Sequence, residues 1–185
     1  MLYTRKGDAG TTKTFGCDQR ISKSSAVAEA LGSLDEANSF IGLLRAKCAS
    51  ERSFSVLGVS FQDILFGIQQ DLFIIQAETA GADGKTIARE KVVSAEKIVD
   101  AIEKKLPPIK SFFIPGATEM GAMFDMARTV SRRAERRVVA VSEEGAVKIG
   151  EHSLAYLNRL SSLLYALARY SNFLLEAGEK SPDYK

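Results

Sequence analysis

One run of the chain, residues 56–79, constrains the fold more than any other stretch. Its apolar residues are spread over much of the circumference of a helix, at Leu57, Phe61, Ile64, Leu65, Ile68, Leu72, Phe73 and Ile75. A helix that is apolar on most of its sides has to be covered by other elements of the protein. The run therefore predicts a central helix.

Four further stretches carry apolar residues at helical spacing. They are residues 24–48, with Ser24 or Ser25 available as N-cap, and residues 89–106, 118–145 and 150–177. Strand signal is almost absent outside the N-terminal region, and 185 residues suffice for one well-buried core. We therefore predict a single-domain, all-α, five-helix bundle with ferritin-like up-down packing. It comprises an N-terminal arm (1–23), the bundle (24–177) and a frayed tail (178–185).

The stretch from Met126 to Val138 is rich in arginine and is predicted to be helical. On such a helix Arg128, Arg132 and Arg136 fall on one face, with Glu135 beside them. Arginine forms bidentate contacts with phosphate groups, so this face is a candidate anion clamp. The alternative is a solvated surface helix held by salt bridges.

The N-terminal arm has a composition that suits phosphate binding. Residues 4–16 contain three glycines, four threonines and three basic residues. Glycines let backbone N–H groups approach a ligand closely, and hydroxyls and cationic side chains add further donors. The spacing differs from the G-x-x-x-x-G-K-[ST] loop, and a flexible arm without a ligand is the alternative.

Two other segments carry residues that need an explanation. Asp35 and Asn38 lie three residues apart among apolar neighbours, where a carboxylate needs a partner such as an arginine from elsewhere. Phe112, Phe113 and Ile114 precede a Pro-Gly pair in a linker. The linker is either a plug over the end of the bundle or an apolar wall for a flat ligand.

Composition excludes several kinds of chemistry. The single histidine, His152, and two cysteines, Cys17 and Cys48, cannot form a zinc cage or a Ser-His-Asp triad, so we assign no metal ligand. A net charge of +2 argues against a nucleic-acid partner. The chain has no apolar signal core and no long apolar run, which predicts a cytoplasmic protein without membrane contact.

Four separate stretches resemble the signature blocks of one family, in one order: Thr4–Thr12, Glu29–Asn38, Arg128–Arg136 and Tyr156–Ser161. The family is that of the PduO-type ATP:cob(I)alamin adenosyltransferases, and the resemblance covers nearly the whole chain. It implies a homotrimeric five-helix bundle that binds ATP, Mg²⁺ and cobalamin, with sites between subunits. In the implied reaction the reduced cobalt attacks the 5′ carbon of ATP, giving adenosylcobalamin and triphosphate. A corrinoid reductase is a possible partner.

The resemblance also implies roles for individual residues. The residues that would face the phosphates are Thr4, Lys6, Gly7, Gly10, Thr11, Thr12 and Lys23. The residues that would complete the nucleotide site with its Mg²⁺ are Arg132, Glu135, Asn158 and Arg159. The catalytic group would comprise Arg132, Arg128 paired with Asp35, and Phe112 on the corrinoid side. We expect the Asp35–Arg128 pair to be mostly buried and to form between subunits.

The chain departs from the family pattern at four positions. Ser131 stands in place of a usual Cys, Asp125 of a His, Ala117 of a Gly and Ser162 of an Asp. None of these changes removes a guanidinium group or the Asp35 carboxylate. Two other functions are compatible with a basic helical bundle: a non-catalytic protein that binds a polyanion such as RNA, and an ATP-dependent phosphotransferase, which the missing Walker-type loop disfavours.

Overall fold

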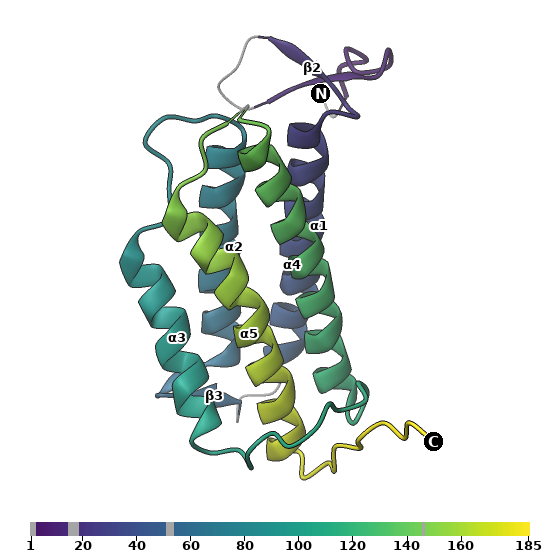
Figure 1. Cartoon of the computed structure of the whole chain (residues 1–185), viewed down its shortest axis with the longest axis vertical. Coiled ribbons are helices and arrows are strands. Elements are labelled where there is room, and N and C mark those ends of the chain that lie inside the picture. The colour runs from purple at the N-terminus through teal and green to yellow at the C-terminus, as the bar shows by residue number, and fades with distance from the viewer. Residues whose placement is uncertain (1–2, 15–18, 51–53, 146) are drawn as a thin grey trace.

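The computed structural model describes residues 3–14, 19–50, 54–145 and 147–185. The helices of this part of the chain are α1 (Ala26–Cys48), α2 (Phe61–Thr79), α3 (Arg89–Glu103), α4 (Glu119–Glu143) and α5 (Glu151–Leu174). The prediction of an all-α, five-helix bundle in one domain is confirmed (Figure 1). Gly16 and Cys17, which the sequence analysis considered, lie outside the described residues.

The long helices pack side by side, and consecutive helices run in alternate directions (Figure 1). Helix α4 packs on α1 and α5, α2 packs on α1, and α3 packs on α5. The N-terminal arm lies at the end where α1 begins, whereas the linker after α3 and the C-terminal tail lie at the opposite end (Figure 1). Within the described residues, none of the helices combines the length and the apolar character that a bilayer crossing would need.

Two short antiparallel hairpins accompany the helices. In the arm, β1 (Thr11–Lys13) pairs with β2 (Arg20–Ser22), which agrees with the N-terminal strand signal. Before α2, β3 (Ser55–Val56) pairs with β4 (Val59–Ser60).

The second hairpin corrects the predicted start of the central helix. Leu57 and Gly58 form its turn with positive φ angles of 53° and 77°, so Leu57 is 63% exposed instead of helical and buried. Helix α2 starts only at Phe61, where Ser60 Oγ accepts a hydrogen bond from the Asp63 N–H. One side of α2 also stays open, because Phe66 and Phe73 are exposed.

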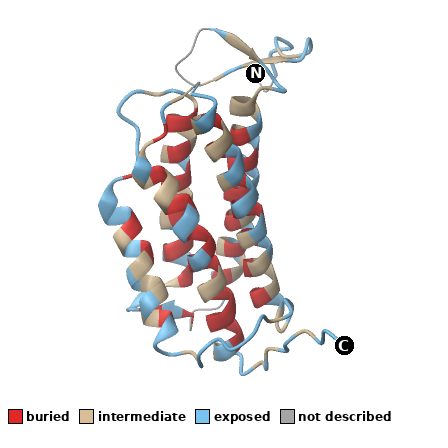
Figure 2. Cartoon of the chain, in the orientation of Figure 1, coloured by how far each residue is buried: buried red, intermediate tan, exposed pale blue. Residues whose placement is uncertain are grey.

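The core is continuous along the inner faces of the helices (Figure 2). Helix α4 contributes Ala127, Val130, Ala134 and Val138, the apolar repeat that the sequence predicts. Because these residues recur at three and four positions, the arginines between them are directed away from the core.

The start of α4 is fixed by a cap and by close packing on α5. Thr118 Oγ1 accepts a hydrogen bond from the Gly121 N–H at 2.9 Å and donates one to Asn172 Oδ1 at 2.7 Å. A Cβ atom on Gly121 would lie 2.1 Å from Asn172 Oδ1. Only glycine therefore fits at this crossing without displacing Asn172.

A polar cluster connects three helices inside the bundle. The Asp71 carboxylate on α2 lies 2.9 Å from Lys91 Nζ on α3 and is hydrogen-bonded to the Tyr156 hydroxyl on α5. Burial raises the pKa of Tyr156 well above its usual value, and the charge of Asp71 adds to the shift. Tyr156 is therefore held neutral in the folded protein.

This raised pKa predicts a loss of stability in alkaline solution. In the unfolded chain Tyr156 ionises near pH 10, so its contribution is complete below that pH and is lost as the pH rises towards the folded-state pKa. Above pH 10 we expect the free energy of unfolding to fall more steeply in the wild type than in Tyr156→Phe, by up to about 1.4 kcal/mol per pH unit. Urea titrations at pH 9 to 11 measure this, with the exposed Tyr184→Phe as the control. Equal slopes in Tyr156→Phe and the wild type would contradict the assignment.

Candidate active site

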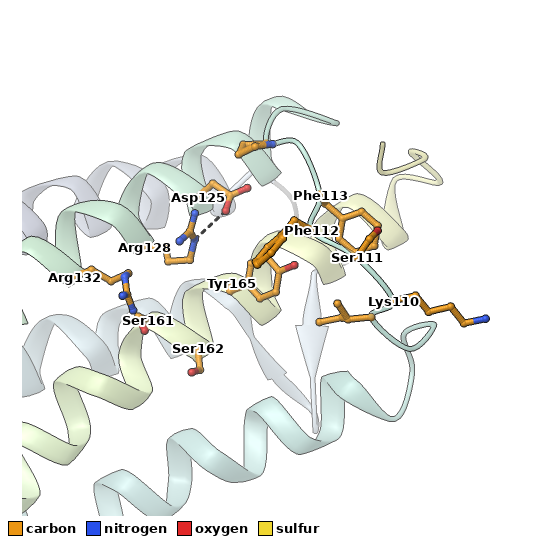
Figure 3. Close-up of a pocket in the computed structure, with 12 residues that line it drawn as sticks. Lys110, Ser111, Phe112, Phe113, Asp125, Arg128, Arg132, Ser161, Ser162 and Tyr165 are labelled. Atoms are coloured by element: carbon orange, nitrogen blue, oxygen red, sulfur yellow. Dashed lines mark hydrogen bonds and ion pairs between the residues drawn. The ribbon is translucent and has the colours of Figure 1, made fainter. Parts of the chain in front are cut away.

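A pocket of about 640 Å³ opens between the linker and helices α4 and α5 (Figure 3). Its polar wall comes from Asp125, Arg128 and Arg132 on α4 and from Ser161, Ser162 and Tyr165 on α5. Its apolar wall comes from the linker residues Ile109, Phe112, Phe113 and Pro115. The pocket thus brings together three of the four predicted catalytic residues, namely Phe112, Arg128 and Arg132.

The two aromatic residues of the linker lie in different environments. Phe113 is partly buried, with the Arg169 guanidinium 4.8 Å from its ring centroid. Phe112 is 79% exposed and lies with Tyr165 beside the pocket (Figure 3). Of the two alternatives for the linker, Phe113 fits a plug and Phe112 fits the wall of a binding site.

Arg128 is paired within its own helix. Its Nε lies 3.0 Å from Asp125 Oδ1, and its guanidinium lies 5.9 Å from the centroid of the Tyr165 ring. Asp35, by contrast, is exposed on α1 and is not brought to Arg128 within the chain. The expectation that Asp35 is surrounded by apolar residues is wrong for the single chain. Successive helical residues are rotated by about 100°, so Leu34 is directed into the core and Asp35 away from it. A pair between subunits stays a prediction.

Three further arginines of α4, namely Arg132, Arg133 and Arg137, lie in two kinds of environment. Arg133 pairs with Glu36, and Arg137 Nε lies 3.4 Å from Glu29 Oε1, so these two residues fit the salt-bridged surface helix. Arg132 lines the pocket instead, and no carboxylate among the described residues pairs with it. Arg132 is therefore available to an anionic ligand.

Beyond Arg132, three predicted nucleotide-binding residues form one polar chain. Asn158 Nδ2 donates to Glu135 Oε1 at 3.0 Å, and Arg159 donates to Asn158 Oδ1 at 3.0 Å. Arg159 Nε also donates to Glu96 Oε1 on α3 at 2.8 Å. Glu96 was not predicted from the sequence, because one acidic residue on the outer face of an amphipathic helix gives no distinct signal.

Burial governs the ionisation of the tyrosine in the pocket. Burial raises the pKa of Tyr165, while the neighbouring Arg169 lowers it by a smaller amount. The hydroxyl of Tyr165 stays protonated, so it offers a hydrogen-bond donor in the pocket that Arg128 and Arg132 also line. Ser131, one of the departures from the family pattern, is buried on the inner face of α4, and Ser162 on α5 lines the pocket.

The predicted phosphate-binding residues of the arm gather in one turn. The Lys23 N–H donates to the Gly10 carbonyl at 2.9 Å, and Gly10 has a φ of 78°. A Cβ atom on Gly7 would lie 3.3 Å from Lys23 Nζ, so the ammonium group passes directly over this glycine. Thr11 and Thr12 lie on β1 of the hairpin, whereas Thr4 and Lys6 precede it in the chain and are exposed.

Arg20, which the sequence analysis did not select, holds this turn together. Its Nε donates to Thr11 Oγ1 and its Nη2 to the Thr11 carbonyl, both at 2.8 Å, and Nη2 also donates to the Lys6 carbonyl. Its position opposite Lys13 in the hairpin is the only signal that could have identified it, and that register is set by the fold.

The arm and the linker that carries Phe112 lie at opposite ends of the bundle (Figure 1). Helix α5, which runs between these ends, has 24 residues and so spans about 36 Å. One chain therefore does not bring the glycine-rich turn to the linker that carries Phe112.

Comparison with known proteins identifies relatives along most of the chain. The family described as "Cobalamin adenosyltransferase" matches residues 2–171. The corrinoid adenosyltransferase PduO of Citrobacter freundii is 38% identical over 91% of this chain, which spans about half the length of that relative. The corrinoid adenosyltransferase of Bacillus subtilis is 39% identical over 92% of this chain and 86% of its own length.

Solved structures resemble the fold closely. A variant of the PduO-type ATP:corrinoid adenosyltransferase from Lactobacillus reuteri, complexed with cobalamin and ATP, superposes with a TM-score of 0.86. It is 29% identical in sequence, and the match covers all of this chain and 97% of the other. The similarity thus extends from sequence to fold.

Proposed function

Because this chain belongs to the cobalamin adenosyltransferase family, we propose that it transfers the 5′-deoxyadenosyl group of ATP to the cobalt of a reduced corrinoid. One observation carries the proposal: a single pocket combines the exposed Phe112, which suits a flat apolar ligand, with the unpaired Arg132, which suits a phosphate. The relatives named above, with their cobalamin and ATP complex, support the same substrates.

The amino-acid composition, with one histidine and two cysteines, fits a reaction in which a substrate supplies the nucleophile. The Co(I) centre supplies the electron pair of the new Co–C bond, the C5′–O bond of ATP breaks, and triphosphate leaves with the electron pair of that bond. The protein then has to align two ligands and stabilise charge on the departing oxygens. Arg132 performs the second task, and no histidine, cysteine or serine nucleophile is required.

Glu135 and Asn158 fit a Mg²⁺ ion that accompanies ATP. They offer carboxylate and amide oxygens on facing helices, and their 3.0 Å hydrogen bond holds both side chains in place. Magnesium in such sites takes one or two protein oxygens and completes its shell with phosphates and water. Bound there, the ion would neutralise part of the triphosphate charge, and Arg159 would orient Asn158 through their hydrogen bond.

The nucleotide site is proposed to form between subunits of a homotrimer. The arm lies at the opposite end of the bundle from the linker that carries Phe112, and in this proposal a second copy of the chain supplies the turn around Gly7, Gly10 and Lys23 to the pocket (Figure 1). Open apolar side chains on α1 and α2, including Leu43, Phe66 and Phe73, support association between copies.

We further propose a cytoplasmic location, where ATP is available and the redox environment is reducing. Reduction of the corrinoid to Co(I) requires an electron donor, so a corrinoid reductase is a proposed partner.

The Asp35–Arg128 pair gives a test of the assembly. If Asp35 of one subunit meets Arg128 of the next, Asp35→Asn and Arg128→Ala should each raise the KM for the corrinoid, because each removes one side of the ion pair between subunits. The double variant should be less impaired than the sum of the singles, with a coupling energy of about 0.5–3 kcal/mol. Steady-state kinetics and sedimentation of the four proteins measure this coupling. Asp125→Asn removes the partner of Arg128 within the chain and measures that bond separately, and strictly additive effects of Asp35→Asn and Arg128→Ala would contradict the pair.

One assay separates the proposed function from its alternatives. The protein is incubated with ATP and a chemically reduced corrinoid, and the cobalt absorbance and phosphate products are followed. Adenosyl transfer yields triphosphate together with the spectrum of an alkylated corrinoid. Release of ADP would indicate a phosphotransferase, whereas binding of RNA without turnover would indicate a polyanion-binding protein.

A further inference from the structure

The C-terminal segment, expected to be frayed, contains three consecutive residues that bond to the rest of the protein. Glu179 accepts hydrogen bonds from Arg169 Nε at 2.9 Å and from Asn172 Nδ2 at 3.2 Å. The carbonyl of Lys180 accepts one from the Ile114 N–H at 2.8 Å, and Ser181 Oγ lies 2.7 Å from Ser111 Oγ. We call residues 179–181 the C-terminal strap.

The strap is anchored by an ion pair that is largely withdrawn from solvent. The side chains of Arg169 and Glu179 are only 7% and 15% exposed. Solvent-exposed ion pairs contribute little to stability, but this pair is mostly buried. Its loss should therefore have a larger effect than the loss of a surface pair. The mechanism proposed above gives no role to either residue.

The same arginine also contacts the linker. Its guanidinium lies 4.8 Å from the ring centroid of Phe113, and its Nη2 lies 3.5 Å from the Pro107 carbonyl. Arg169 therefore joins the strap on one side to the linker on the other.

The contacts of the strap bracket Phe112. Ser111 precedes it and bonds to Ser181, while Ile114 follows it and bonds to Lys180. Residues 107–114 have no regular secondary structure, so within the described chain these contacts replace the hydrogen bonds that a helix or a strand would supply. Phe112 itself stays 79% exposed, although Ser111 before it and Ile114 after it are both hydrogen-bonded to the strap.

We propose that Glu179 is a positioning residue for the corrinoid. It fixes Arg169 and the strap, which hold the linker so that Phe112 is presented to the corrinoid before binding. This inference rests on the proposed function for the identity of the ligand. Its physical basis is that a disordered linker would have to be ordered on binding, and the loss of conformational freedom would weaken affinity.

The test compares full-length wild type with Glu179→Ala and with Asp183→Asn, a matched acidic change in the exposed tail. Hydrogen–deuterium exchange of the Ile114 amide reports whether the linker is held, without any ligand. Steady-state kinetics then report the KM for the reduced corrinoid and, separately, the KM for ATP. In Glu179→Ala we expect amide exchange of Ile114 to accelerate and the corrinoid KM to rise by about tenfold, with kcat and the ATP KM unchanged. Asp183→Asn should match the wild type in every measurement.

A second variant separates the loss of the strap contact from unfolding of the protein. Glu179→Ala leaves the Arg169 charge buried without its partner, so the double variant Arg169→Gln with Glu179→Gln removes both charges at once. It should retain the fold by circular dichroism and still show faster exchange at Ile114 and a raised corrinoid KM.

The possible outcomes are distinguishable. Unchanged Ile114 exchange and unchanged corrinoid KM in folded Glu179 variants would overturn the role of the strap while leaving the enzyme assignment intact. A parallel rise of both KM values would also overturn it, because that result indicates a general structural role. A wild type without triphosphate release would instead overturn the proposed function, and the exchange experiment would still decide whether the strap holds the linker.

Discussion

Replacing Arg132 with lysine is expected to lower kcat by about 10²–10³-fold while leaving the fold intact. Arg132 lines the pocket and has no carboxylate partner among the described residues, so its guanidinium is free to bind two oxygens of the triphosphate. A lysine keeps the positive charge but cannot form the planar, bidentate contact. Triphosphate release under saturating ATP and corrinoid measures the loss, and thermal melting checks the fold.

Arg137→Lys is the matched control for this experiment. Arg137 lies on the same helix but pairs with Glu29 at 3.4 Å on the face toward α1. Its replacement should leave turnover close to that of the wild type. Near-wild-type turnover in Arg132→Lys would show that Arg132 does not hold the leaving group.

Replacing Phe112 with alanine is expected to reduce turnover by roughly 10- to 160-fold, which corresponds to the 1.5–3 kcal/mol gained when such a side chain is buried against a ligand. The side chain is 79% exposed, so its removal should not destabilise the fold. A drier lower face of the corrinoid disfavours water as a cobalt ligand and eases reduction to Co(I). The variant should therefore accumulate more water-ligated Co(II) in the absorbance spectrum, while its affinity for ATP stays unchanged.

Leu57→Ala serves as the control for Phe112→Ala. Leu57 is a similarly exposed apolar residue in the β3–β4 turn, outside the pocket. It should affect neither turnover nor the cobalt spectrum. Weaker ATP binding or outright unfolding in Phe112→Ala would instead indicate that Phe112 is part of a plug.

The sequence predicted the elements that follow from local rules. Helix α1 begins after Ser25 and α4 after Thr118, because each side chain accepts a hydrogen bond from the first turn. Apolar spacing alone extended α2 too far towards the N-terminus, since Leu57 continues the repeat. The chain instead turns at Gly58, which has a positive φ, and forms the β3–β4 hairpin. A hydrophobic pattern carries no information about this backbone angle.

Some residues of the site were predicted from the sequence and others were not, because motifs identify residues but do not identify all of their partners. The resemblance assigned Arg132 to the nucleotide and Phe112 to the corrinoid, and the structure brings both residues to one pocket, although Phe112 lies outside the four motif blocks. The partner of Arg128 was not foreseen, although Asp125 lies three residues earlier on the same helix. The bond between Glu179 and Arg169 could not be foreseen either, since the tail carries no periodic pattern and its contacts depend on the path of the linker.

The order in which helices pack also has a consequence for how fast the chain folds. Helices α1 and α2, and likewise α4 and α5, are neighbours in sequence and pack on each other, so each pair can form as a local hairpin. The contact of α1 with α4 instead joins residues 72 positions apart, as in the Lys47–Glu119 ion pair. Closing that long loop costs chain entropy before any contact is gained. Docking of the two hairpins is therefore expected to limit the folding rate, and substitutions between α1 and α4 should slow refolding more than substitutions within either hairpin.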